Sequence, residues 1–301
     1  MKYVTKMELY KVFSKKQIYI IVAVGLILQI IISSQMRTTM FEGYHKTVYQ
    51  HYMSELEGNY SVEKKNYVNA EYEKFQNLLC NEEKYELAYN NGELDGDEYR
   101  SLLDDIKTAK YRIETLEYVV EKTNYFDNSE NQAEYFYDTE LNDYVGNLGF
   151  NIIAMIVILL IIIPMYTDDF YSGTVSMIKS SKNGRKVLFF SRLKITMVIS
   201  TVVYVLFAAT EFVTKYLLFD LGNLNACIGS LMIDRIADLP NSFINLSIWK
   251  FIVFLYLIYL VEAILLAVIG LVVSKVSRGN IEAFTIMSVI LIGKRLFALL
   301  M

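Results

Sequence analysis

The chain has 301 residues, 54% of them hydrophobic, and many of the apolar residues lie in unbroken blocks. The formal net charge of -4 gives no reason to expect a nucleic-acid partner, and the small numbers of prolines (2) and glycines (14) argue against a loop-rich β fold. The two cysteines, Cys80 and Cys227, and two histidines form no Cys/His cluster, so neither a metal site nor a redox site is expected.

The N-terminal region predicts a membrane span that follows a basic segment. Residues 17–34 form an apolar run close to the roughly 20 residues that cross a bilayer as a helix. The preceding lysines are Lys2, Lys6, Lys11, Lys15 and Lys16. A signal peptide would end in a small-x-small cleavage site, but SSQMRTTM follows, so we interpret the run as a retained span. The positive-inside rule then places the N-terminus in the cytoplasm.

Residues 35–147 predict an extracellular acidic helical domain. Residues 36–147 contain 24 acidic and 11 basic residues. Apolar residues recur at helical spacing between Leu102 and Val120, and the turn-rich stretch NNGELDGDEYR at 90–100 separates that helix from an earlier one at 61–90. We expect an antiparallel helical hairpin of coiled-coil type with tyrosines along its packing face. The pattern favours a solvated spacer; the alternative is a substrate gate or a docking surface.

A basic segment lies between the next two spans. Residues 148–166 form the cleanest apolar run of the chain, and a further run covers 195–219. The residues between them carry six basic side chains: Lys179, Lys182, Arg185, Lys186, Arg192 and Lys194. The positive-inside rule places this segment in the cytoplasm. Apolar residues interleaved with basic ones are typical of a segment that lies along the membrane face or docks a cytoplasmic partner.

Two more apolar runs, 250–274 and 281–301, predict the fourth and fifth spans, although Lys294 and Arg295 interrupt the last one. Glu211 and Lys215 fall in the third span and Glu262 in the fourth. An ionised side chain at that depth costs roughly 3 kcal/mol, so these residues are candidates for a translocation path. The alternatives are a local ion pair for Glu211 and Lys215, and a hydrogen bond between helices for Glu262.

The run Asp169-Phe-Tyr-Ser-Gly173-Thr174, placed just after the second span, resembles the acidic-xxx-Gly-Thr signature of ABC-2 type transporter permeases. That family usually has Glu where this chain has Asp169. The opening MELYKVFSKKQIYI at 7–20 is similar to the amphipathic helix that precedes the first span in the family. A large external insert between the first two spans resembles an exporter subgroup common in Gram-positive bacteria.

The resemblance implies an all-α polytopic bundle that forms the membrane subunit of an ATP-driven exporter in the plasma membrane. A separate ABC ATPase subunit would carry ATP and Mg²⁺, and the permease would pair with itself or with a second permease. Residues 167–194 would press on the ATPase, and the implied coupling residues are Asp169, Gly173, Thr174, Arg185, Arg192 and Lys194. The chain has no GxxxxGK[ST] phosphate loop, so we expect neither a catalytic nor a cofactor site in it.

The expected domains are 1–34, with the first span; 35–147, the extracellular helical domain; and 148–301, the remaining bundle with segment 167–194. The family implies six spans, whereas the sequence predicts about five, so the last apolar run is the end of a truncated bundle, a re-entrant segment or an interfacial helix. Two other functions stay open. One is a membrane sensor whose external helical domain binds a ligand, and the other is an immunity or scaffold protein.

Overall fold

The computed structural model describes residues 2–35, 43–128, 133–171, 184–219, 221–233, 245–277 and 279–300. Within these ranges the chain is almost entirely α-helical, with one short antiparallel pair between β1 (Gly58–Asn59) and β2 (Glu134–Tyr135). The chain forms two compact units. We name them the bundle unit (Met1–Met36, Gly149–Leu218 and Phe254–Met301) and the hairpin unit (Arg37–Leu148 and Phe219–Val253).

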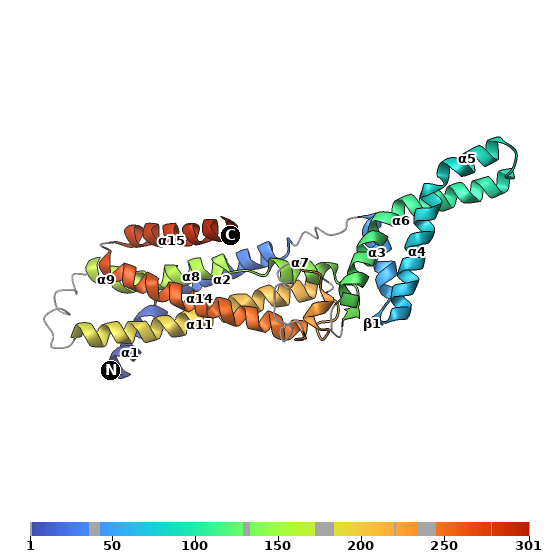
Figure 1. The fold of residues 1–301 in the computed structure, drawn as a ribbon. Coiled ribbons are helices and arrows are strands. Elements are labelled where there is room, and N and C mark those ends of the chain that lie inside the picture. Colours follow the sequence, from blue (N-terminus) through green and yellow to red (C-terminus); the bar gives the residue numbers. More distant parts are fainter. Residues whose placement is uncertain are drawn as a thin grey trace. The chain divides into compact units, whose positions relative to one another are not determined.

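The bundle unit is built from long apolar helices (Figure 1). It contains α1 (Lys2–Phe13), α2 (Lys16–Ser33), α8 (Ile152–Ile162), α9 (Pro164–Tyr171), α11 (Gly184–Leu218), most of α14 (Ile248–Val276), and α15 (Asn280–Leu300). Pro164 separates α8 from α9 because its nitrogen cannot donate the hydrogen bond that a continuous helix needs.

Among the described residues, four segments are long and apolar enough to cross a membrane: Lys16–Ser33, Thr139–Asp169, Gly184–Leu218 and Ile248–Val276. They indicate a multi-pass membrane protein. The fifth apolar run lies in α15, whose apolar part within the described side chains is Asn280–Gly293. A fifth span there stays a prediction.

Small residues bring the bundle helices close together. A Cβ atom on Gly25 would lie 2.7 Å from Val157 Cγ2 and 2.9 Å from Phe207 Cζ, so α2, α8 and α11 meet at this glycine. Ala263 and Ala267 on α14 are fully buried against the same core. The small-residue face of α14 is therefore used for packing inside the chain.

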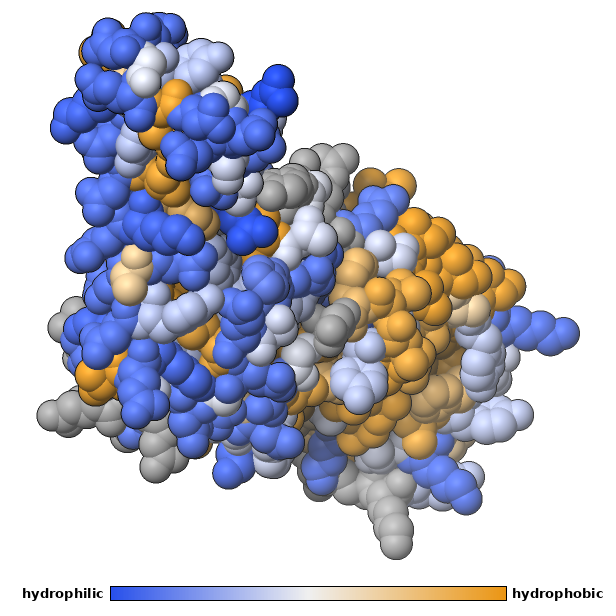
Figure 2. Space-filling view, turned by 90° about the vertical axis from the view of Figure 1, so that its right-hand side faces the viewer, coloured by the Kyte–Doolittle hydropathy of each residue, from blue (hydrophilic) through white to orange (hydrophobic). Residues whose placement is uncertain are grey.

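The opposite faces of the span helices remain apolar and exposed. Figure 2 shows a continuous hydrophobic surface of this kind, and residues that contribute to such faces include Ile20, Val24, Val202, Leu257 and Val261. A helix that is apolar both inside the bundle and on its outer face is typical of a membrane span, because lipid replaces water around it.

The hairpin unit contains α3 (Tyr44–Glu55), α4 (Val62–Cys80), α5 (Glu82–Asn90), α6 (Gly96–Asn128), α7 (Thr139–Asn147) and the 3-10 turn η1 (Ile228–Ser230). Ser61 caps α4 by accepting a hydrogen bond from the Lys64 backbone N–H at 3.3 Å. α4 packs along α6, and Gly92, at φ +74°, lies in the turn that reverses the chain. The helix predicted at 61–90 is interrupted at Asn81, which separates α4 from α5.

The prediction that tyrosines line the hairpin's packing face holds only in part. Val68, Phe75, Leu116 and Val119 fill the contact between α4 and α6, and the fully buried tyrosines of this core come from α3 and β2: Tyr49, Tyr52 and Tyr135. Tyr67 and Tyr111 on the hairpin are largely exposed. A tyrosine hydroxyl needs a hydrogen-bond partner, and Tyr67 finds one at the surface, where its hydroxyl donates to Glu55 Oε2 at 2.8 Å.

A buried charged network ties three parts of the hairpin unit together. Lys122 on α6 and Asp138, which precedes α7, are fully buried, and Lys122 Nζ lies 2.7 Å from Asp138 Oδ2. The Tyr49 hydroxyl on α3 donates to Asp138 Oδ1 at 2.6 Å, and Asn142 Nδ2 donates to Asp138 Oδ2 at 2.7 Å. Buried charges are tolerated only when paired in this way. The sequence pattern gave no sign of this pair.

Candidate functional site

Three consecutive residues in α9 each contact a different element of the bundle unit. The Thr167 hydroxyl donates to the Asn280 side chain at the start of α15. Asp168 forms an ion pair with Lys15, which lies between α1 and α2. Asp169 accepts hydrogen bonds from Lys11 Nζ on α1, at 2.6 Å, and from Arg192 on α11. α9 therefore contacts the N-terminal helix α1, the C-terminal helix α15 and the long helix α11.

Arg192 is the most deeply buried charge of this cluster, with a side chain only 1% exposed. Its Nε atom donates to Glu8 Oε2 at 2.7 Å and its Nη2 atom donates to Asp169. The guanidinium carbon lies 4.3 Å from the centre of the Tyr166 ring, close enough for a cation–π contact. A planar fork of donors can serve two carboxylates and an aromatic face at once, which a lysine cannot do.

We name this cluster the charged junction, and it consists of Glu8, Lys11, Lys15, Asp168, Asp169 and Arg192. Three acidic and three basic side chains make it formally neutral. Mutual pairing offsets the cost of removing these charges from water. Removal of Arg192 would take away the ion-pair partner of Glu8, and removal of Asp168 would take away that of Lys15.

The local sequence explains how α1 reaches the junction. Glu8, Lys11 and Lys15 are spaced by three and four residues, so they lie along one face of the N-terminal segment. Val12 is buried in the bundle core, whereas Tyr3, Met7 and Tyr10 are exposed. This mixture of charged and apolar exposed residues is typical of a helix that lies at a membrane surface.

The structure brings together two of the six predicted coupling residues. Asp169 and Arg192 form an ion pair at the junction, whereas Arg185 and Lys194 are exposed on α11. Gly173 and Thr174 lie outside the described residues. Sequence reasoning missed Glu8, Lys11 and Lys15 as members of this site. Their regular spacing just before the first span was the available signal, but it did not identify their partners.

The charges predicted within the spans lie away from the junction. Glu211 on α11 accepts a hydrogen bond from Asn151 Nδ2 at 3.1 Å, and Asn151 also caps α8. Lys215 follows one turn later on α11, and Glu262 is half-buried on α14. Asn151 is therefore a further partner of Glu211, one that the sequence did not reveal. A translocation role for Glu211, Lys215 and Glu262 stays a prediction.

No group of His, Cys, Asp and Glu side chains that could hold a metal ion occurs in the described part of the chain. No protein-family model matches the chain, and neither the curated proteins nor the solved structures include a significant match. The geometry of the site is that of an ion-pair linkage between α1, α9 and α11.

Proposed function

We propose that this chain is the permease subunit of an ATP-driven exporter of the ABC-2 type, and that residues 167–194 transmit force from a separate ATPase. The observation that carries the proposal is the position of Asp169. This residue is the acidic member of the acidic-xxx-Gly-Thr motif, and its carboxylate joins α9 to both α1 and α11. A motif residue at such a connection supports a role in transmitting movement.

The charged junction has the physical properties that such transmission needs. Residues 172–183 connect α9 to α11, so a force applied there acts on both helices. The ion pairs through Arg192 and Lys11 extend the same connection to α1. Separation of the buried Arg192 from its two carboxylates costs several kcal/mol, so the ends of the helices that it links would move together rather than slide apart. A shift of α1, α9 and α11 would then open the bundle alternately toward the cytoplasm and toward the exterior.

The proposal also assigns the remaining parts. The N-terminus and residues 167–194 face the cytoplasm, and the hairpin unit lies outside the cell. ATP and Mg²⁺ bind to the ATPase subunit, because the chain lacks the phosphate loop that would hold them. Two permease chains, identical or different, enclose the path.

Purification of the intact chain from its native host in mild detergent tests the proposal. We expect an ATP-hydrolysing protein with its own phosphate loop to be recovered with the chain. Arg185→Glu should reduce that recovery by roughly ten-fold, because loss of one charge-assisted contact has about this effect. Gly173→Leu should also reduce it, because a leucine side chain would hinder close approach of the ATPase to the backbone. Arg100→Glu is the matched control, since Arg100 is an exposed arginine on α6 of the hairpin unit.

Equal recovery of the ATPase with all variants would show that residues 167–194 are not the coupling segment. Recovery of a kinase in place of an ATPase would favour the sensor function instead. The absence of any co-purifying nucleotide-hydrolysing protein, with the chain itself well folded, would contradict the exporter proposal and favour an immunity or scaffold protein.

A further inference from the structure

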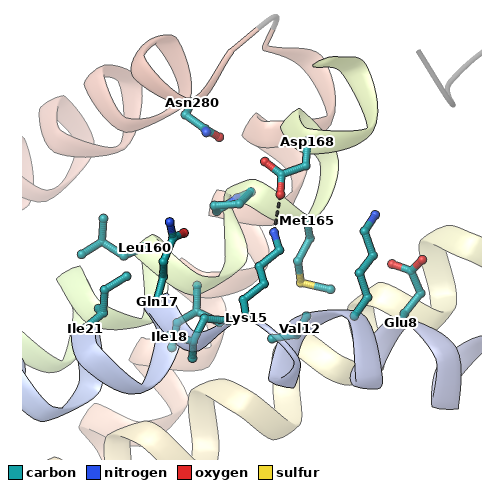
Figure 3. A pocket seen from close by; sticks show the side chains of 13 residues that line it. Glu8, Val12, Lys15, Gln17, Ile18, Ile21, Leu160, Met165, Asp168 and Asn280 are labelled. Atoms are coloured by element: carbon teal, nitrogen blue, oxygen red, sulfur yellow. Dashed lines mark hydrogen bonds and ion pairs between the residues drawn. The ribbon is translucent and has the colours of Figure 1, made fainter. Parts of the chain in front are cut away.

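A cavity of about 140 Å³ lies beside the charged junction, between α1, the start of α2, the α8–α9 segment and the start of α15. Figure 3 shows the polar ends of Lys15, Asp168 and Asn280 pointing toward one another above the α2 backbone. The polar and charged residues that line the cavity are Glu8, Lys11, Lys15, Gln17, Asp168 and Asn280. The junction uses several of these charges, but Gln17 and Asn280 are outside it.

The lining changes from polar to apolar along the direction of the spans. α2 begins at Lys16, and its residues Ile18 and Ile21 line the apolar side of the cavity together with Leu160 of α8. α2 and the α8–α9 segment therefore both change from polar or charged to apolar side chains within the length of the cavity. A membrane span makes this change where the headgroups of a bilayer meet the acyl chains, so the cavity lies at that depth.

The charges of the lining select the chemistry of a ligand. Two acidic side chains, Glu8 and Asp168, face two basic ones, Lys11 and Lys15, and the cavity is formally neutral. Each of these side chains already has an ion-pair partner, yet an ammonium has three donors and a carboxylate accepts up to about four hydrogen bonds. The site can therefore take a ligand that carries one positive and one negative group without breaking the junction.

We propose that this cavity binds the headgroup of an ethanolamine phospholipid, with its acyl chains leaving along Ile21 and Leu160. The phosphate accepts hydrogen bonds from Lys11, Lys15 and the Gln17 amide. The primary ammonium donates to Glu8, Asp168 and the Asn280 side-chain oxygen. A choline headgroup has no N–H to donate, and a glycerol headgroup leaves the two carboxylates facing an uncompensated phosphate. This inference requires a chain in a bilayer but does not depend on the ATPase partner.

Lipid binding to the delipidated full chain in detergent tests the inference, with native mass spectrometry as the measurement. Phosphatidylethanolamine should bind roughly ten-fold more tightly than phosphatidylcholine or phosphatidylglycerol of the same chain length, which corresponds to loss of about one charge-assisted hydrogen bond. Ile21→Trp fills the apolar side of the cavity and should abolish the preference. Ile20→Trp is the matched control, because Ile20 is 62% exposed on the outer face of α2.

Gln17→Leu provides a second test that hardly changes the volume of the side chain, and it should weaken phosphatidylethanolamine binding while the chain remains monodisperse. The same preference for phosphatidylethanolamine in Ile21→Trp as in Ile20→Trp would overturn the assignment. Tighter binding of phosphatidylglycerol than of phosphatidylethanolamine would also overturn it, since the carboxylates would then not be selecting an ammonium.

Discussion

At the charged junction, the single buried side chain of Arg192 holds three groups together. Its guanidinium contacts Glu8, Asp169 and the face of Tyr166 simultaneously. Arg192→Lys keeps the charge but cannot satisfy two carboxylates and the ring together, so we expect a loss of roughly 1–3 kcal/mol and a lower Tm for the purified protein. Arg185→Lys is the control, because Arg185 is exposed on the same helix. An equal Tm for both variants would contradict the geometry of the junction.

Asp127 in the hairpin unit gives a prediction about acid stability. A hydrogen bond from Lys65, supported by one from the Tyr60 hydroxyl, holds the pKa of Asp127 below its usual range. A lowered pKa in the folded state contributes stability above the unfolded value of about 3.9, and that contribution disappears as the pH falls through the folded pKa.

We therefore expect Asp127→Asn to lower Tm at pH 6, and the difference from the unmodified chain to shrink as the pH falls below about 3.9, as measured by thermal unfolding between pH 6 and pH 3. Asp97→Asn is the control, because Asp97 pairs with Arg100 only at 3.9 Å between highly exposed side chains. A difference between Asp127→Asn and the unmodified chain that stays constant from pH 6 to pH 3 would show that the carboxylate is not the cause.

At the scale of elements, the pair formed by Lys122 and Asp138 links α6 to the start of α7, and Tyr49 adds α3 to the link. Lys122→Met would leave the Asp138 carboxylate buried without its cation, and we expect a loss of about 3–5 kcal/mol. The double variant Lys122→Met/Asp138→Asn should recover part of that loss, because no buried charge remains. Thermal unfolding of both variants measures the coupling. A double variant less stable than Lys122→Met alone would contradict this account.

The spans could be predicted closely from the sequence, because an unbroken apolar run has few alternatives to a membrane helix. The predicted runs 17–34 and 250–274 correspond to α2 (Lys16–Ser33) and α14 (Ile248–Val276). The third was predicted to begin at 195, but α11 begins at Gly184, since basic residues end an apolar run without ending a helix.

The partners within the site could not be predicted in the same way. Lys11 and Asp169 are 158 positions apart, and a periodic pattern on one helix does not specify which distant helix it meets. The buried pair of Lys122 and Asp138 was missed for a related reason. In the sequence, a lysine and an aspartate in an acidic, polar segment resemble surface residues. Only the folded structure shows that the rings of Phe126 and Phe136 pack around Lys122.

At the scale of the whole molecule, the chain combines a bundle unit of long apolar helices, which holds the charged junction, and a second compact unit. The exporter proposal requires residues 167–194 to face the cytoplasm and the hairpin unit to face the exterior. The distribution of Lys and Arg predicts both orientations, and the structure does not test them. Reversal of the orientation would place the coupling segment where no ATP-driven subunit could reach it.

Labelling of an engineered cysteine with a membrane-impermeant maleimide on whole cells tests this orientation most directly. Ser181→Cys is introduced into a chain in which Cys80 and Cys227 are replaced by serine, and a second chain that retains only the exposed Cys80 reports the outer side. We expect Cys80 to be labelled on intact cells and the cysteine at position 181 to be labelled only after the membrane is permeabilised. Ready labelling at position 181 on intact cells would contradict the topology and, with it, the proposed coupling to an ATPase.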